Sequence, residues 1–271
     1  MQDVTTEVQG QVGLITLNRP KALNALNTAM CKAITEALRS WEDNPNIGAV
    51  VVRGAGGRAF CAGGDVVMLH ESGLGDGKDA EEFWRIEYAL NELIHRYRKP
   101  YISMIDGIVM GGGVGLSIHG RHRIAGDETL FAMPETGIGY FPDVGGTYFL
   151  PRLGQAEAMW LGLTGARLKT AAVCEMGIAT AYIPSANHQN FIQALTKAPL
   201  DGTDASVLDI MMRFVEKPDP AENLPSSLQV FGAGSVVEIM DKLARDDSEW
   251  AKKQHSIMLK KSPLALSLIH I

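Results

Sequence analysis

Two acidic residues, Glu135 and Asp143, lie eight positions apart in the segment MPETGIGYFPDVGG, and each directly follows a proline. The rest of this segment consists mostly of small, apolar and aromatic residues. Two carboxylates that share an apolar pocket cannot both ionise cheaply, so their pKa values separate and one of them tends to keep a proton. Such a pair suits proton transfer or nucleophilic attack. The structural alternative is that each acid caps a turn or a helix, which Asp143 could do before Val-Gly-Gly.

Two glycine-rich segments precede the acids and could present backbone N–H groups to a ligand. The first is FCAGGD at residues 60–65, and the second is GIVMGGGVGLS at residues 107–117. Adjacent glycines allow a sharp turn that exposes amides, and a helix after the triple glycine would add the free amides of its first turn. A tight turn and close helix packing are the structural alternatives. The Gly-Lys-Ser/Thr ending of a Walker loop is absent, and the dinucleotide fingerprint is poorly matched.

The hydrophobic pattern around these segments predicts alternating strands and helices. Residues 12–17 and 48–53 are rich in β-branched residues, and the apolar residues between 27 and 43 recur with helical spacing. A strand, a helix and a second strand in this order predict a βαβ unit with a right-handed crossover. Further predicted elements are a strand in YISMIDG, one or two strands in HRIAGDETLFAM, and helices over 79–97, 111–119, 155–164, 170–177, 234–245 and 247–260. We therefore expect an α/β core domain over residues 1–185 and a helical C-terminal region over residues 186–271.

The end of the sequence has the features of a helix start. Ser262 and Pro263 are suited to the N-cap and the first turn, yet only eight residues follow Pro263 and none of them closes the helix. We therefore expect the chain to be truncated at Ile271.

The composition of the 271-residue chain is that of a soluble globular protein, with 46% hydrophobic and 21% charged residues. A formal net charge of −6 and the lack of a long basic run argue against nucleic-acid binding. No apolar stretch is long enough to span a bilayer, and the first residues lack the features of a signal or transit peptide. The three cysteines have no metal-ligand spacing, so we expect reduced thiols, no metal site and a cytoplasmic protein without membrane attachment.

The order and spacing of these motifs are more specific than any one of them alone. LNRPKALNAL, AFCAGGD, KPYISMIDGIVMGGGVGLS and MPETGIGYFPDVGGTYFLPRL together resemble the crotonase, or enoyl-CoA hydratase/isomerase, superfamily over residues 8 to about 185. The resemblance implies an α/β fold in which a spiral of ββα units is followed by helices. It also implies a CoA thioester substrate whose carbonyl oxygen lies between the backbone N–H groups of Gly64 and Gly112. Two such donors stabilise a developing oxyanion by several kcal/mol.

The acids distinguish members of this superfamily. Hydratases that resemble this sequence carry two catalytic glutamates, and the position of the first is occupied here by Gly115. Glu135 occupies the second position, and Asp143 stands where typical hydratases have glycine. This pattern, together with FWRIEYALN at residues 83–91, resembles the 3-hydroxyisobutyryl-CoA hydrolase subfamily. The subfamily resemblance implies that Glu87 also faces the substrate, although on its own Glu87 would be read as a solvated helix residue.

The resemblance predicts hydrolysis of a short 3-hydroxyacyl-CoA thioester, with 3-hydroxyisobutyryl-CoA in valine catabolism as the best match. Ionised Glu135 would attack the thioester carbonyl or activate the attacking water. Asp143 would hydrogen-bond the 3-hydroxyl group or that water. An enoyl-CoA isomerase or hydratase is the first alternative, and a non-catalytic CoA-binding protein is the second. Asp143 argues against the isomerase, which has no evident use for a second acid at this position.

The remaining expected contacts are to CoA. Arg19 and Lys21 are cations available to its phosphates, with an ordinary exposed turn as the alternative. The resemblance implies that the backbone at Ala62 and Gly63 faces the adenine and that Asp65 belongs to the same substrate-binding segment. Because CoA is part of the substrate, no separate cofactor is expected. By analogy with the family, we expect a homo-oligomer, either a trimer or a hexamer.

Overall fold

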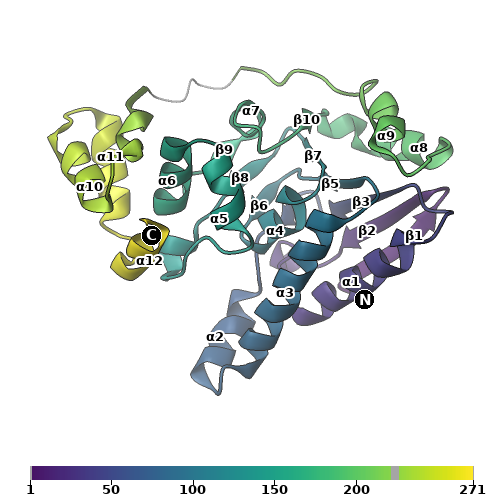
Figure 1. Ribbon diagram of the computed structural model, residues 1–271, viewed down its shortest axis with the longest axis horizontal. Helices are drawn as coiled ribbons and strands as arrows, with labels where there is room; N and C mark the ends of the chain where they lie inside the picture. Colours follow the sequence, from purple (N-terminus) through teal and green to yellow (C-terminus); the bar gives the residue numbers. More distant parts are fainter. Residues whose placement is uncertain (1, 221–225, 271) are drawn as a thin grey trace. The chain divides into compact units, whose positions relative to one another are not determined.

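The structure is a computed structural model that describes residues 2–220 and 226–270 (Figure 1). The chain divides into two compact units. Unit 1 comprises Met1–Phe131 and Lys169–Pro220, and unit 2 comprises Ala132–Leu168 and Ala221–Ile271. Each unit is therefore built from two separate stretches of sequence.

The predicted βαβ unit is present in unit 1. Strand β2 (Val12–Leu17), helix α1 (Thr28–Glu42) and strand β3 (Ala49–Gly54) follow one another, and the two strands pair in parallel. α1 begins where the Asn27 side chain accepts a hydrogen bond from the Met30 backbone N–H at 2.8 Å. The buried residues of α1 recur at helical spacing, as the sequence pattern indicates.

Unit 1 contains a six-stranded sheet in the order β1-β2-β3-β5-β7-β10. Its remaining strands are β1 (Val4–Gln9), β5 (Tyr101–Met104), β7 (His122–Ala125) and β10 (Ala181–Tyr182). β1 pairs antiparallel with β2, and the other neighbouring pairs are parallel. Parallel strands are buried on both faces, which explains why β3 reads as the continuous apolar run Ala49 to Val52 instead of an alternating pattern.

Two helices late in unit 1 pack on this sheet. α8 (His188–Lys197) and α9 (Asp204–Met211) share one apolar cluster with sheet residues such as Val51 and Ile102. The cluster residues that the two helices contribute are Phe191, Ile192, Leu195, Val207, Ile210 and Met211. The domain boundary expected at residue 185 therefore falls inside unit 1, because hydrophobic burial joins these helices to the sheet.

A second sheet has four short strands in the order β4-β6-β8-β9. These strands are β4 (Ala59–Cys61), β6 (Ile108–Met110), β8 (Leu130–Ala132) and β9 (Leu168–Lys169). The chain passes from unit 1 to unit 2 in β8 and returns in β9. The other helices of unit 1 are α2 (Val66–Leu74), α3 (Lys78–Arg96), α4 (Gly112–Ile118) and α7 (Thr170–Glu175). α2 lies outside the predicted elements; none of its residues is buried, and its apolar residues form a run at its start instead of recurring at helical spacing.

Unit 2 is helical. Its elements are the 3-10 turn η2 (Glu135–Ile138), α5 (Gly146–Phe149), the 3-10 turn η3 (Leu150–Arg152), α6 (Gln155–Thr164), the 3-10 helix η5 (Ser226–Gly232), α10 (Val236–Arg245), α11 (Glu249–Met258) and α12 (Pro263–His270). A buried hydrogen bond from Trp160 Nε1 to Gln254 Oε1, 3.1 Å long, joins α6 to α11. The helix start expected at Ser262 and Pro263 is confirmed, because Ser262 Oγ accepts a hydrogen bond from the Ala265 N–H.

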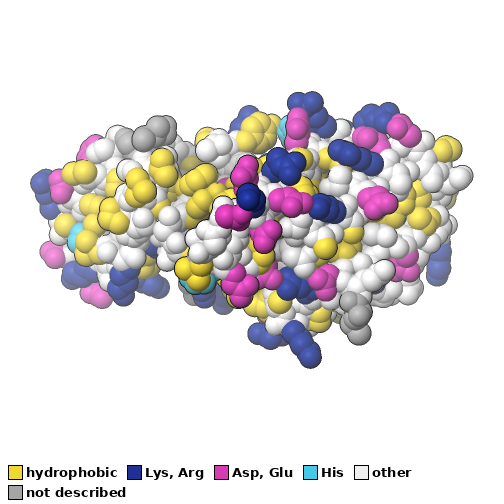
Figure 2. All heavy atoms as spheres, turned by 90° about the horizontal axis from the view of Figure 1, so that it is seen from below, with side chains coloured by type: hydrophobic (Ala, Val, Ile, Leu, Met, Phe, Trp, Pro, Cys, Tyr) yellow, Lys and Arg dark blue, Asp and Glu magenta, His cyan; other side chains and the backbone are white. Residues whose placement is uncertain are grey.

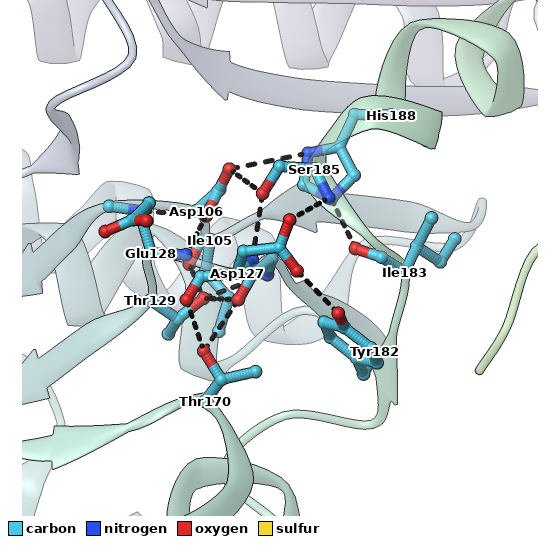
Figure 3. Close-up of polar contacts among 12 residues, drawn as sticks. Ile105, Asp106, Asp127, Glu128, Thr129, Thr170, Tyr182, Ile183, Ser185 and His188 are labelled. Atoms are coloured by element: carbon cyan, nitrogen blue, oxygen red, sulfur yellow. Dashed lines mark hydrogen bonds and ion pairs between the residues drawn. The ribbon is translucent and has the colours of Figure 1, made fainter. Parts of the chain in front are cut away.

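A polar network in unit 1 holds the segment after β10 against the loops that follow β5 and β7 (Figure 3). Ser185 Oγ donates a hydrogen bond to Asp106 Oδ2 at 2.7 Å. The Ser185 backbone N–H donates to Asp127 Oδ2 at 3.0 Å, and the Tyr182 hydroxyl donates to the other oxygen of Asp127. These contacts anchor the chain just before α8.

The loop after β2 is anchored by a buried asparagine. Asn24 is fully buried, and its Nδ2 donates to the carbonyl oxygens of Ala55 and Ala59 at 3.0 and 2.8 Å. Its Oδ1 accepts a hydrogen bond from the Arg19 backbone N–H at 3.0 Å. Asn24 also has a φ of 57°, a conformation that asparagine adopts more readily than most residues. One side chain thus ties this loop to β4 and to the end of β3.

We expect Asn24→Ala to lower the free energy of unfolding by about 2–4 kcal/mol, because three backbone groups, one of them buried and two partly buried, lose their hydrogen bonds to this side chain. Urea unfolding followed by circular dichroism measures the change. Asn46→Ala is the matched control: Asn46 is exposed, and its replacement should stay within about 0.5 kcal/mol of the wild type. Equal stability of Asn24→Ala and the wild type would contradict the anchoring role.

Candidate functional site

The glycine pair expected to hold an oxyanion lies together in unit 1. Gly64 lies just after β4, and Gly112 is the first residue of α4. A Cβ atom placed on Gly112 would lie 3.3 Å from the Gly64 backbone nitrogen, so the two backbones approach closely. Among the described residues, neither of these N–H groups has a hydrogen-bond acceptor. Two unpaired amides in close proximity can bind one oxygen atom.

The packing around α4 requires glycine at two adjacent positions. A Cβ atom on Gly112 would lie 2.3 Å from Glu87 Oε1, and one on Gly113 would lie 2.1 Å from the carbonyl oxygen of Cys61. Both distances are far shorter than van der Waals contact. The close helix packing that was the structural alternative for this segment is therefore present at Gly112 and Gly113. It is compatible with a binding role, because the same close approach brings the Gly112 amide to Gly64.

Glu87 lies on the buried face of α3, and its carboxylate reaches Gly112. Only 2% of Glu87 is exposed, so it is not the solvated residue that its sequence position alone suggests. Unit 1 thus brings together Gly64 and Gly112, where the family resemblance places the thioester carbonyl, and Glu87, which the resemblance places facing the substrate.

The loop after β2 is bonded to the strand end that carries the glycines. The Ala62 N–H donates to the Leu23 carbonyl at 3.0 Å. The Leu26 N–H donates to the Gly63 carbonyl, and the Asp65 N–H donates to the Leu26 carbonyl, each at 2.8 Å. This short parallel pairing holds the backbone on both sides of Gly64, which is what a preorganised amide donor needs.

The two residues expected to bind CoA phosphates, Arg19 and Lys21, differ in burial and in their hydrogen bonds. Arg19 is partly buried, and its guanidinium donates to Asp65 Oδ2 at 2.9 Å and to the Ala25 carbonyl at 2.7 Å. Asp65 also caps α2 by accepting a hydrogen bond from the Met68 N–H. Lys21 is exposed. Arg19 is therefore not an ordinary exposed turn residue, whereas the Lys21 ammonium is open to solvent and to a ligand.

In unit 2, Glu135 begins the η2 turn and is buried, with 6% of its surface exposed. Neither of its carboxylate oxygens has a hydrogen-bond partner among the described residues. Burial raises the pKa of Glu135 to about 8; the charge of Asp143 adds to the rise, while the backbone amide of Glu135 and the Lys261 ammonium oppose it. In the absence of substrate, most Glu135 side chains are therefore protonated at pH 7.

Asp143 acts on Glu135 from the turn that leads into α5. It is partly buried, and its carboxylate is close enough to Glu135 to raise the pKa of that residue. The turn contains two consecutive residues with positive φ, Val144 at 45° and Gly145 at 85°. A β-branched residue rarely adopts this conformation, so the turn is strained in the way that functional sites often are. The two acids thus lie within electrostatic reach of each other, as the sequence predicts.

The structure groups the predicted residues into two sets. Unit 1 holds the glycine amides, Glu87 and the loop that is expected to bind CoA, and unit 2 holds Glu135 and Asp143. Lys261, which is not among the residues predicted from sequence, lies in unit 2 and acts electrostatically on Glu135. Two adjacent lysines before a Ser-Pro helix start are typical of a solvated helix end, so no local signal marks Lys261.

A second cluster in unit 1 contains serine, histidine and aspartate but is not arranged for nucleophilic attack (Figure 3). Ser185 Oγ donates to the Asp106 carboxylate and not to His188. His188 Nε2 donates to the Ile183 carbonyl at 2.9 Å, while its Nδ1 lies 3.9 Å from Asp106 Oδ2. A nucleophilic serine needs a histidine base as its hydrogen-bond acceptor. This cluster is therefore structural.

Other classes of site find little support in the described part of the chain. No group of three or more His, Cys, Asp and Glu side chains in it is placed to hold a metal ion. None of its helices is long and apolar enough to cross a membrane. On the face drawn in Figure 2, Lys and Arg side chains are interspersed with Asp and Glu. A nucleic-acid surface would instead gather the cations together.

Comparison with known proteins gives the family. A family described as enoyl-CoA hydratase/isomerase matches residues 12–270. The mitochondrial 3-hydroxyisobutyryl-CoA hydrolase of Xenopus laevis is 46% identical over 266 residues, which cover 96% of this chain and 69% of the relative. The protein of the same name from Danio rerio is 44% identical over 277 residues, covering 98% of this chain and 72% of the relative. A crystal structure of a carnitinyl-CoA dehydratase from Mycobacterium thermoresistibile has a TM-score of 0.91 and 41% identity, covering 99% of this chain and 78% of that chain.

These relatives correct one expectation. The sequence predicts a cytoplasmic protein, but both hydrolases are named as mitochondrial. The prediction of a cytoplasmic location is therefore wrong. It rested on cysteine content and on the first residues, and reduced thiols indicate a reducing compartment without deciding which one.

The similar solved structure and the family match both agree with the fold and the family expected from sequence. The expected crotonase-like α/β fold is confirmed by the superposition that covers 99% of the chain. The family match begins at the second strand and continues to the last helix, so it includes both glycine segments and both acids. The chain belongs to the enoyl-CoA hydratase/isomerase family.

Proposed function

We propose that this protein hydrolyses 3-hydroxyisobutyryl-CoA, a short 3-hydroxyacyl-CoA thioester of valine catabolism, to the free acid and CoA. The relatives that are 46% and 44% identical carry the name of this activity. The observation that carries the proposal is the acid pair of unit 2, in which buried Glu135 has a raised pKa and Asp143 lies within electrostatic reach. Hydrolysis of a thioester needs a nucleophile or a base at the carbonyl carbon, and this pair supplies one.

Gly115 argues against a hydratase or dehydratase. Addition of water across a carbon–carbon double bond requires proton handling at two carbons, and hydratases that resemble this sequence use a glutamate at this position. Gly115 is buried in α4 and has no side chain to offer. Each proton-handling group contributes about 10²–10⁴ in rate. The relative from Mycobacterium thermoresistibile is named a dehydratase, so overall similarity does not decide the reaction.

In the reaction that the family resemblance implies, the glycine amides and Glu135 act on one thioester carbonyl. The carbonyl oxygen accepts hydrogen bonds from the Gly64 and Gly112 N–H groups, and ionised Glu135 attacks the carbon or takes a proton from the water that attacks it. Negative charge then develops on the oxygen, where the two amides stabilise it. The carbon–sulfur bond breaks, and CoA leaves as a thiol after gaining a proton. Water supplies the new hydroxyl of the acid, directly or by hydrolysing an acyl intermediate on Glu135.

The acyl group is proposed to contact two further acids. Glu87, whose carboxylate lies beside Gly112, accepts a hydrogen bond from the 3-hydroxyl group. Asp143 orients the attacking water. Because one methyl group changes discrimination by only about 1–3 kcal/mol, 3-hydroxypropionyl-CoA should also be a substrate.

The CoA part is proposed to bind along the loop after β2. Exposed Lys21 offers its ammonium to a phosphate, and Arg19, held by Asp65, shapes the loop. The backbone at Ala62 and Gly63 faces the adenine. Self-association into a trimer or a hexamer, and the lack of a separate cofactor, stay predictions from the family resemblance.

We expect the purified protein to release CoA thiol from 3-hydroxyisobutyryl-CoA, and more slowly from 3-hydroxypropionyl-CoA, as measured with a thiol-reactive dye. Crotonyl-CoA is the control for hydration, followed by loss of its enoyl absorbance. Hydration of crotonyl-CoA without thiol release would refute the proposed hydrolase activity and would show that the protein is a hydratase. CoA binding without any reaction would favour the non-catalytic alternative.

We expect Glu135→Gln and Asp143→Asn each to lower kcat for thiol release by at least ~10²-fold, because each removes a group that moves a proton or attacks in the transition state. Glu175→Gln is the control, since Glu175 is exposed and lies in unit 1. Circular dichroism checks that all three variants fold. Rates like that of the wild type in both acid variants would refute the roles assigned to the carboxylates.

We expect kcat/KM for thiol release to rise with pH and to level off above pH 8. Burial raises the pKa of Glu135 to about 8, so the reactive ionised form is the minor form below this pH and the major form above it. Well below pH 8, kcat/KM should rise nearly tenfold for each pH unit, because kcat/KM follows ionisation of the free enzyme. A profile that falls with increasing pH between 6 and 8 would mean that the protonated acid is the reactive form.

A further inference from the structure

Lys261 occupies a partly buried position beside the turn that carries Glu135, within unit 2. The next residue, Ser262, donates its backbone N–H to the Thr136 carbonyl at 3.2 Å. Thr136 is held in turn, because its hydroxyl donates to the Leu163 carbonyl at 3.2 Å. The backbone of Lys261 is thus fixed against the residue that directly follows Glu135.

The Lys261 ammonium lies beside two glycines of unit 2. A Cβ atom on Gly137 would lie 3.4 Å from Lys261 Nζ, and one on Gly165 would lie 3.5 Å from it. The same Gly165 Cβ position is 3.0 Å from Pro134 Cα. The ammonium therefore lies close to the chain on both sides of Glu135. A Cβ atom at either position would be in ordinary van der Waals contact with it.

The charges around Glu135 in unit 2 act in opposite directions. Asp143 raises the pKa of Glu135, and Lys261 lowers it. Burial lowers the pKa of Lys261, and Glu135 opposes that change. The Lys261 ammonium makes no direct hydrogen bond or ion pair with a described residue. A lysine can usually extend its ammonium into water, so a partly buried ammonium near an unpaired carboxyl group indicates a specific electrostatic role.

We propose that Lys261 is a positioning residue for hydrolysis, whose ammonium favours the ionised form of Glu135 and keeps this carboxylate available near neutral pH. The kinetic part of this inference rests on the proposed function, but the effect on Glu135 does not. A direct ion pair would occupy the oxygen lone pairs that attack the substrate or accept the proton. A cation that acts without a direct bond makes ionisation less costly and leaves those lone pairs free.

The test replaces Lys261 and follows ionisation of Glu135 directly. Protein labelled with glutamate carrying ¹³C at the carboxyl carbon is titrated by NMR, and the Glu135 signal is identified by its loss in Glu135→Gln. We expect Lys261→Met to raise the titration midpoint of Glu135 by about one pH unit, because a neighbouring positive charge is removed. Lys261→Arg keeps the charge and should restore a midpoint near that of the wild type. Lys260→Met is the matched control, since Lys260 is the adjacent exposed lysine.

Kinetics give the second readout. In Lys261→Met, kcat/KM at pH 7 should fall about tenfold, which is the loss of ionised Glu135 that a shift of one pH unit causes. The rate at high pH should approach that of the wild type, and KM should change little. A purely structural role would lower the rate at all pH values without moving the profile. Lys261→Gln replaces Lys261→Met if the latter does not give the far-UV circular dichroism spectrum of the wild type.

An unchanged Glu135 midpoint in Lys261→Met or Lys261→Gln would overturn the inference. An equal shift in Lys261→Arg would also overturn it, because that result would show that charge is not the cause. If the wild type releases no thiol from any acyl-CoA, the proposed function fails. The NMR titration still decides the role of Lys261 in that case.

Discussion

The burial of the Glu135 carboxyl group without a hydrogen-bond partner is the constraint on which the arrangement of unit 2 depends. A carboxylate that is paired with donors has a low pKa and is a poor base, whereas one in an apolar setting has a raised pKa and keeps its lone pairs free. Such a group costs stability, so the packing around it must hold it in place. The hydrogen bonds of Thr136 to Leu163 and of Ser262 to Thr136 do this with backbone and hydroxyl groups that do not touch the carboxylate.

In unit 1, the groups proposed to stabilise negative charge are themselves uncharged. Its proposed donors are backbone amides, whose positions are set by β4 and by the first turn of α4. Glycine at positions 112 and 113 is needed because any side chain there would overlap Glu87 or Cys61. Donors fixed in this way need little reorganisation when an oxyanion forms. The buried Asn24 extends this rigidity to the loop after β2, which pairs with the backbone around Gly64.

The family to which the chain belongs shows how one fold serves several reactions on similar substrates. The relatives from Xenopus laevis and Danio rerio are named as hydrolases and the one from Mycobacterium thermoresistibile as a dehydratase, although all three are at least 41% identical to this chain. Amide donors like those proposed at Gly64 and Gly112 would suit each of these reactions, because each can place negative charge on the thioester oxygen. Acids around the carbonyl would then distinguish one reaction from another. A glycine at position 115 and an aspartate at position 143 therefore say more about the reaction than the fold does.

Much of the fold and the types of the site residues could be predicted from sequence, because they depend on local patterns. The βαβ unit, the helices over residues 155–164 and 234–245, and the helix start at Ser262 follow from periodicity and capping. The glycine pairs and the two acids follow from their residue types and from their order along the chain. Helix α2 could not be predicted in this way, because its apolar residues form a run at its start and do not recur at helical spacing.

The sequence by itself determined which groups were available: two amide donors, two acids after prolines, and a buried core that could support them. Only the tertiary structure decided that Glu135 is the acid with the raised pKa, that Glu87 is buried beside Gly112, and that Lys261 lies next to the η2 turn. It also decided that residues 132–168 group with the C-terminal helices and that residues 188–211 join the sheet. The physical reason is that burial and electrostatic reach depend on residues far apart in the chain, whereas periodicity and capping depend on near neighbours.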